Sequence, residues 1–222
     1  MTKRRMRPPP AEPAADSVST PERVRRAAVA LFKARGYHGT SVRALALYAR
    51  IEAASLYHHF PSKQDILAAV FEHVMNDMVE GLEEALAGAD DHETRLRRVL
   101  RTHILFHIDR QDEAFVSHSE LRSLTAANRR RVNAKRDRYE ARFRAVLADG
   151  VDAGVFAVPD VQLATIAILT MCSSVSDWFA DRGRLSADAV ADGYAEMVLR
   201  MLRPADGPAP ARGAAASPRG RA

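Results

Sequence analysis

The segment from residue 40 to residue 63 constrains the fold more than any other part of this chain. Its first half has the apolar i, i+3, i+4, i+7 spacing of an amphipathic helix that Thr40 can cap, through Val42, Leu45, Ala46 and Ala49. A turn at residues 50–52 precedes a second, short helix with Leu56 and Phe60 on one face. Its other face carries hydrogen-bonding tips, those of Ser55, Tyr57, His58 and His59. So short a helix needs tertiary packing, and its polar face suits insertion into a DNA major groove.

The segment resembles the DNA-binding region of TetR-type transcriptional regulators, which typically read T-[ST]-V-R-x-[IL]-A-x-x-A-G-[VI]-s-x-[GA]-[ST]-[LF]-Y-x-[HY]-F-x-[SN]-K. The matching residues are Thr40, Ser41, Val42, Arg43, Leu45, Ala46, Ala49, Ile51, Ala54, Ser55, Leu56, Tyr57, His59, Phe60, Ser62 and Lys63. Two positions depart from this pattern. Arg50 replaces a glycine that serves a left-handed turn, which predicts modest strain or an altered turn. Glu52 replaces a small polar residue, which predicts a weaker helix cap.

The resemblance also implies roles in DNA binding for residues of this helix-turn-helix segment. Phosphates would be bound at the first helix start, by Thr40 and Ser41, and on either side of the groove, by Tyr57, His58 or His59, and Lys63. Base edges would be read by Arg43, Ala53, Ala54 and Ser55. For Tyr57, a ring packed into the head with only its hydroxyl on the DNA is the alternative.

Positive charge is concentrated in the same region. The chain has 222 residues and a formal net charge of +5. Residues 20–65 have eight basic and three acidic side chains, a net charge of +5. Residues 66–202 have 17 basic and 22 acidic side chains, a net charge of −5. The remaining +5 lies in residues 1–19 (+2) and in the tail from residue 203 (+3). A basic head on a mildly acidic body suits phosphate binding, although charged residues also cover ordinary solvated faces.

The rest of the chain predicts an all-α fold with a three-helix head and a helical ligand-binding and dimerisation domain. A first helix starts at Thr20 and ends at Gly36, and Ser62 caps a long helix that links head and body. Further helices are expected near residues 92–109, 111–123, 126–153, 159–180 and 186–202. The predicted domains are a disordered basic tail (1–19), the helix-turn-helix head (20–65), the body (66–202) and a disordered C-terminal tail (203–222).

The last two expected helices are too apolar for each to have only one buried face. They are either buried within one subunit or packed against the same pair in a second subunit. The resemblance favours the second arrangement, a homodimer through the helices near 159–180 and 186–202. Two-fold symmetry would then predict an approximately palindromic DNA operator.

The resemblance further implies a small-molecule effector pocket in the body. The residues expected to line it are Leu100, His103, Ile104, His107, Phe115, Leu121, Tyr139, Phe143, Met171 and Trp178, although each could equally be ordinary core. The arginine-rich run at residues 122–143 resembles a branch that senses acyl-CoA thioesters, where Arg122, Arg129 or Arg130 would neutralise a CoA phosphate. The alternative is a solvated helix face with pairs such as Arg136–Glu140.

Other functions find less support in the sequence. His103 and His107 have the i, i+4 spacing of metal ligands, and His118 could add a third, but pocket lining or ordinary packing explains them better. No metal or cofactor is therefore expected. Cys172 is the single cysteine, and no catalytic motif gathers Ser, His and Asp, so an enzyme is not expected. The prediction is a ligand-responsive, cytoplasmic repressor without a membrane span; the alternative is a DNA-binding regulator that has no ligand, either constitutive or an activator.

Overall fold

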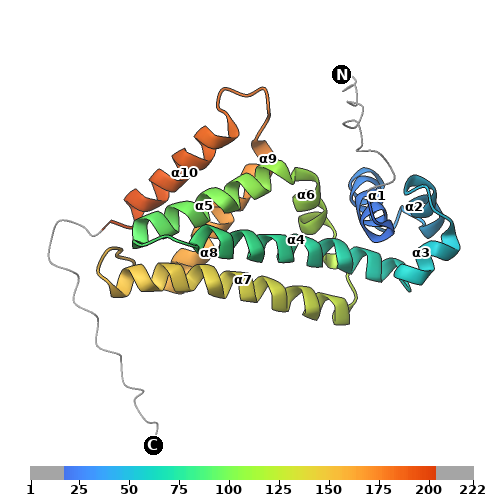
Figure 1. The fold of residues 1–222 in the computed structure, drawn as a ribbon, viewed down its shortest axis with the longest axis horizontal. Helices are drawn as coiled ribbons and strands as arrows, with labels where there is room; N and C mark the ends of the chain where they lie inside the picture. Colours follow the sequence, from blue (N-terminus) through green and yellow to red (C-terminus); the bar gives the residue numbers. More distant parts are fainter. Residues whose placement is uncertain (1–17, 204–222) are drawn as a thin grey trace, which may run out of the picture.

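The computed structural model describes residues 18–203, and all regular elements in this range are helices (Figure 1). They are α1 (Thr20–Arg35), α2 (Val42–Tyr48), α3 (Ala53–His59), α4 (Lys63–Leu86), α5 (His92–Asp109), α6 (Gln111–Ser119), the 3-10 turn η1 (Leu121–Ser123), α7 (Ala126–Asp152), α8 (Val161–Ser173), α9 (Val175–Trp178) and α10 (Ala187–Met201). The predicted all-α class is confirmed. The tails predicted to be disordered lie outside the described residues, apart from residues 18, 19 and 203.

Two of the predicted helices are interrupted. The helix expected over 159–180 begins at Val161 and breaks at Ser174, because hydroxyls there bond back to the chain: Ser174 Oγ donates to the Met171 carbonyl and Ser176 Oγ to the Ser173 carbonyl. The helix expected over 111–123 ends at Ser119 and continues as η1. The adjoining Glu120 carboxylate accepts hydrogen bonds from the Tyr37 N–H and the Ser123 hydroxyl.

Helices α1, α2 and α3 form a small head at one end of the molecule (Figure 1). Its core contains Val24, Phe32, Leu45 and Leu56, all at most 1 % exposed, and it continues into the first two turns of α4 as far as Phe71. The short helices α2 and α3 are therefore held by burial of one face against α1 and α4 rather than by their own hydrogen bonds.

The start of α2 corrects one prediction. Ser41, not Thr40, caps the helix, since its hydroxyl accepts a hydrogen bond from the Ala44 N–H. Thr40 is 2 % exposed, and its hydroxyl is directed at the carbonyls of Gly36 (2.9 Å) and Leu31 (3.3 Å). The Thr40 hydroxyl is therefore already occupied in this structure, and its contact with a phosphate stays a prediction. The residue ties the end of α1 to the start of α2.

The turn between α2 and α3 has the backbone that the sequence predicted. Arg50 has a φ of 55°, the only positive φ among non-glycine residues in the described range. The guanidinium of Arg23 donates to the carbonyls of Ala49 (2.6 Å) and Arg50 (2.7 Å) and so holds this turn against α1. The strain that arginine brings here is thus opposed by hydrogen bonds from another helix.

Replacing Arg50 with glycine should stabilise the head, because glycine adopts positive φ without steric cost. We expect about 0.5–1 kcal/mol of added stability, since a gain of about 1–2 kcal/mol is partly offset by the greater freedom of unfolded glycine. Urea unfolding of wild type and Arg50→Gly measures the difference, with Arg50→Ala as the control that keeps the strain. A less stable Arg50→Gly protein would contradict the interpretation.

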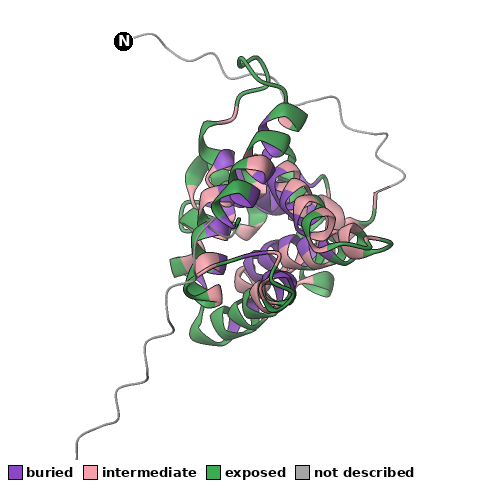
Figure 2. Cartoon of the chain, turned by 90° about the vertical axis from the view of Figure 1, so that its left-hand side faces the viewer, coloured by how far each residue is buried: buried purple, intermediate pink, exposed green. Residues whose placement is uncertain are grey.

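The body is built around α4, which runs from the head along α5 and α7 (Figure 1). Helix α5 is the central element and also contacts α8, α9 and α10. Figure 2 shows that the buried residues lie toward the inside of this group of helices and the exposed residues toward the outside. None of the helices in residues 18–203 is both long and apolar enough to cross a membrane.

Candidate nucleic-acid interface and internal cavity

Helix α3 displays the polar face that the sequence predicted. Leu56 anchors it in the head core, while Ala53, Ala54, His58 and His59 are exposed and Tyr57 is 52 % exposed. Ser55 is half-buried between the two faces. As predicted, no side chain caps this helix at Glu52. The result is a short, rigidly packed helix with small residues at its start and polar side chains along its outer face, a shape that fits a major groove.

The other predicted contact residues lie at two neighbouring helix starts. Ser41 and Arg43 are exposed at the start of α2. Lys63, at the start of α4, lies with its ammonium 4.1 Å from the centre of the Tyr37 ring and donates to the carbonyls of Tyr37 and Thr40, both at 2.8 Å. Lys63 thus joins α4 to the α1–α2 connection, and its contact with a phosphate stays a prediction.

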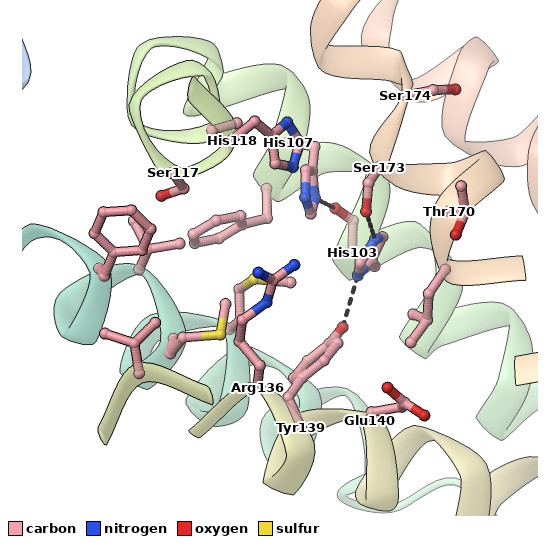
Figure 3. Close-up of a pocket in the computed structure, with 18 of the residues that line it drawn as sticks. His103, His107, Ser117, His118, Arg136, Tyr139, Glu140, Thr170, Ser173 and Ser174 are labelled. Carbon is pink, nitrogen blue, oxygen red and sulfur yellow. Dashed lines mark hydrogen bonds between the residues drawn. The ribbon is translucent and has the colours of Figure 1, made fainter. Parts of the chain in front are cut away.

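The body contains a cavity of about 420 Å³ (Figure 3). One wall is apolar and consists mainly of side chains from α4, α5, α7 and α8: Phe71, Val74, Met75, Met78, Phe106, Val132, Ile166 and Leu169. The other wall is polar: His103, His107, Ser117, His118, Arg136, Tyr139, Glu140, Thr170, Ser173, Ser174 and Asp177. This volume and this mixture are typical of small-molecule sites.

A hydrogen-bonded chain forms the buried part of the polar wall (Figure 3). His103 Nδ1 lies 2.8 Å from the Tyr139 hydroxyl, and His103 Nε2 lies 3.0 Å from Ser173 Oγ. Burial, and to a lesser extent the neighbouring His107, lowers the pKa of His103 well below its usual value. Burial raises the pKa of Tyr139. Both side chains are therefore neutral at physiological pH.

His107 stacks on His103, with ring centres 4.4 Å apart. Its Nδ1 lies 2.9 Å from the His103 carbonyl, which can only accept, so Nδ1 carries the proton. Burial is the main cause that lowers the pKa of His107, and His118 lowers it further, against the opposing effects of the His103 carbonyl and Asp177. The ring is neutral, and its Nε2 remains an acceptor.

Two further polar groups of the cavity lack partners within residues 18–203. The Ser117 hydroxyl is buried and makes no hydrogen bond. Arg136 extends from α7 toward α5 and α6 and has no ion-pair partner in the described chain (Figure 3). Glu140, predicted as its intrahelical partner, instead accepts a hydrogen bond from Gln162 at 2.7 Å. A bound polar group would satisfy the buried Ser117 hydroxyl, and the exposed Arg136 guanidinium is available to pair with an anionic group.

The predicted pocket residues fall into two groups. His103, His107 and Tyr139 line the cavity. The others do not: Leu100, Ile104 and Phe143 are core, Leu121 and Met171 are half-buried, and Phe115, Arg122 and Trp178 are exposed. Arg122, Arg129 and Arg130 lie outside the cavity as well, and the Arg129 guanidinium donates to the carbonyls of Arg122 and Leu124.

Most of the polar lining was not predicted from the sequence, including Ser117, Arg136 and Thr170. For Arg136 a signal existed, because it lies three residues before Tyr139 and hence on the same face of α7. No group of three or more metal-ligating side chains gathers in the described part of the chain, and both ring nitrogens of His103 already have hydroxyl partners.

Helix α6 connects the cavity to the head. Ser117 and His118 face the cavity, while Val116 belongs to the head core. On the same side Glu113 approaches Arg25 of α1, with 3.7 Å between the charged groups. A ligand that moves α6 would therefore also act on α1.

Two family descriptions match the chain. Residues 24–70 match "Bacterial regulatory proteins, tetR family", and residues 89–202 match "Tetracyclin repressor-like, C-terminal domain". The first match contains α2 and α3, and the second contains most of the cavity lining.

Individual proteins are also similar along most of their length. The crystal structure of the TetR family transcriptional regulator PfmR from Thermus thermophilus is 35 % identical, with 80 % of this chain and 97 % of that chain covered and a TM-score of 0.73. The complex of AibR with isovaleryl coenzyme A and operator DNA is 26 % identical, covering 81 % and 97 % of the chains, with a TM-score of 0.72. The HTH-type transcriptional repressor KstR2 of Rhodococcus jostii RHA1 is 26 % identical over 196 residues, 87 % of this chain and 96 % of that protein.

Proposed function

This chain belongs to the TetR family of bacterial regulatory proteins, and we propose that it is a homodimeric repressor released from a palindromic operator by a small hydrophobic effector. One observation carries the proposal. The single short helix α6 has residues that line the cavity, Ser117 and His118, beside residues that contact the head, Glu113 and Val116. The effector would stabilise a position of α6 that the operator-bound head disfavours, and operator DNA must then weaken effector binding by the same factor.

The dimer proposal rests on the outer faces of α8 and α10. Leu163 of α8 is 66 % exposed, and Met197 and Met201 of α10 are 48 % and 65 % exposed. Ile166 of α8 is 46 % exposed but also lines the cavity. Large apolar side chains gathered on two helices are a typical association surface. They support the second of the two arrangements that the sequence left open.

An acyl-CoA thioester is the effector class we propose, with the acyl part in the cavity. The size and apolar wall of the cavity suit an acyl group, and the similar protein AibR was crystallised with isovaleryl coenzyme A. The predicted phosphate partners Arg122, Arg129 and Arg130 do not line the cavity. Arg136, which is exposed and lines it, replaces them as the nearest candidate for an anionic group.

Operator binding by the purified protein on its own promoter, titrated with acyl-CoAs of increasing length, tests this function. Release by an acyl-CoA at micromolar concentration is expected. Specific binding that no thioester changes would favour the alternative, a regulator without a ligand. A body without a cavity would also favour that alternative, so the cavity of about 420 Å³ supports the ligand-responsive form.

Replacing Tyr57 with alanine should weaken operator binding about 10- to 100-fold, since one phosphate or base contact contributes about 1–3 kcal/mol. Tyr57 is 52 % exposed, so the dimer and the fold should be unaffected. Electrophoretic mobility shifts measure the loss. Tyr48→Ala is the matched control, because this tyrosine is 47 % exposed on the neighbouring α2 and no DNA contact is predicted for it. Equal losses in the two variants would refute the role of Tyr57.

A further inference from the structure

The chain of Tyr139, His103 and Ser173 leaves one hydroxyl proton unused. Neutral His103 has one N–H and one bare nitrogen, and each nitrogen faces a hydroxyl. If Tyr139 donates to Nδ1, then Nε2–H donates to Ser173 and the Ser173 proton is left over. If Ser173 donates to Nε2, the Tyr139 proton is left over instead. Neither hydroxyl has another partner within the described residues, so either tautomer presents one free donor beside the cavity.

An acceptor belongs to the same cavity lining. His107 stacks on His103 and keeps an unprotonated Nε2, because its Nδ1–H is bound to the His103 carbonyl. A free donor beside a free acceptor matches an alcohol, which both accepts and donates one hydrogen bond. A saturated hydrocarbon chain would leave both groups unpaired and buried, at a cost.

The guanidinium of Arg136 fixes where that alcohol would lie within a ligand. Arg136 and Tyr139 are three residues apart on α7, so they share a helix face and their Cβ atoms are about 5–6 Å apart. The apolar wall of α4, which contains Met75 and Met78, is made of other side chains. A ligand that meets both groups would carry its oxygen functions toward this face of α7 and its hydrocarbon body against α4.

We propose that the cavity is selective for hydroxyacyl compounds, with the hydroxyl close to the acyl head. The ligand hydroxyl accepts a hydrogen bond from whichever hydroxyl of Tyr139 or Ser173 is left without an acceptor. It donates its own hydrogen bond to His107 Nε2. The carbonyl or anionic head faces Arg136. This specificity rests on the proposed function, because it describes the effector of the same cavity.

Isothermal titration of the full-length protein with 3-hydroxydecanoyl-CoA and with decanoyl-CoA tests the selectivity. The hydroxylated ligand should bind about tenfold more tightly, as expected for two added neutral hydrogen bonds. Free 3-hydroxydecanoate and decanoate distinguish a carboxylate head from a thioester head. Equal affinity for the hydroxylated and plain ligands would overturn this inference and leave the acyl effector intact. If none of the four compounds binds, the acyl effector proposed above fails as well.

Two single variants locate the hydroxyl contact. At least one of Tyr139→Phe and Ser173→Ala should reduce the tenfold preference to less than threefold, depending on which hydroxyl holds the spare proton. The matched controls are Tyr194→Phe and Ser176→Ala, whose side chains do not line the cavity, and they should keep the full preference. A preference that survives in both cavity variants would refute the assignment. Circular dichroism melts confirm that both variants are folded; if one is not, the affinities of the wild-type protein for the hydroxylated and plain ligands decide the selectivity.

Arg136→Gln tests the contact with the carbonyl or anionic end of the ligand separately from the contact with its hydroxyl. This substitution should weaken the binding of both CoA thioesters about tenfold, because the guanidinium contacts the part of the ligand that they share. The ratio of the two affinities should stay unchanged. Arg138→Gln is the matched control, being an exposed arginine of the same helix that does not line the cavity. A changed ratio in Arg136→Gln, or equal losses in Arg138→Gln, would contradict the proposed orientation.

Discussion

Gly193→Arg is expected to convert the protein to monomers and to abolish operator binding. Gly193 is exposed in the middle of α10, and a Cβ added to it would meet no atom within 4 Å beyond its own stretch of helix in residues 18–203. Glycine inside a helix costs about 1 kcal/mol relative to alanine, and nothing in the subunit requires it. Met197 and Met201 follow at i+4 and i+8, so the three residues form one exposed row. A glycine in such a row allows a second helix to approach closely.

A long, charged side chain in this row would separate the two subunits and leave each head intact. Because a dimer binds both half-sites with one molecule, loss of the dimer should weaken operator binding by about 10²–10⁴-fold. Light scattering after size exclusion measures the mass, and mobility shifts measure operator binding. A dimeric Gly193→Arg protein would show that α10 is not at the interface.

Gly193→Ala is a control whose effect depends on whether α10 packs against a partner helix. In an isolated subunit, alanine should stabilise α10 by about 1 kcal/mol. Against a closely packed partner helix, the added methyl group should instead raise the dimer dissociation constant. If the Gly193→Ala protein is more stable and its dimer dissociation constant is unchanged, the partner subunit does not pack closely against α10 at this residue.

The head could be predicted in detail because its signals are local. The apolar residues in residues 40–63 recur with helical spacing, so each short helix has a single face that can be buried. Even so, the roles of Thr40 and Ser41 could not be separated from the sequence. Both residue types can cap a helix, and only the packing of α1 against α2 shows that Thr40 is buried and Ser41 caps.

The cavity was harder to predict, because apolar side chains that face a cavity and those that fill a core look alike in sequence. Leu100 and Ile104 lie on α5 with His103, yet they face the core and are completely buried. Arg136 was missed for the opposite reason: an arginine in a charged run is usually solvated, and only the tertiary structure shows that this one lines a cavity. The break at Ser174 likewise depends on hydroxyl–backbone bonds that compete with the helix.

Acidification from pH 7.5 to pH 5 is expected to destabilise the protein through the buried histidines. Burial holds the pKa of His103 well below the unfolded value of about 6.5, so below pH 6.5 the unfolded chain binds a proton that the folded protein does not. Stability then falls by about 1.4 kcal/mol per pH unit for such a group, or about 2 kcal/mol between pH 6.5 and pH 5. His107 acts in the same direction, because burial is also the main cause that lowers its pKa.

Urea unfolding at fixed protein concentration, at pH 7.5 and at pH 5, measures this loss in wild type and in His103→Gln. Glutamine can still donate to one hydroxyl and accept from another but does not titrate, so the loss on acidification should shrink by about 2 kcal/mol even if the variant is less stable at pH 7.5. His38→Gln replaces an exposed histidine of the head and should keep the wild-type loss. The carboxylates of Glu22 and Glu196, whose pKa values are lowered in the folded protein, lose their contribution mainly below this pH range. An unchanged loss in His103→Gln would therefore mean that His103 is protonated in the folded protein, and that the chain joining it to Tyr139 and Ser173 is not neutral.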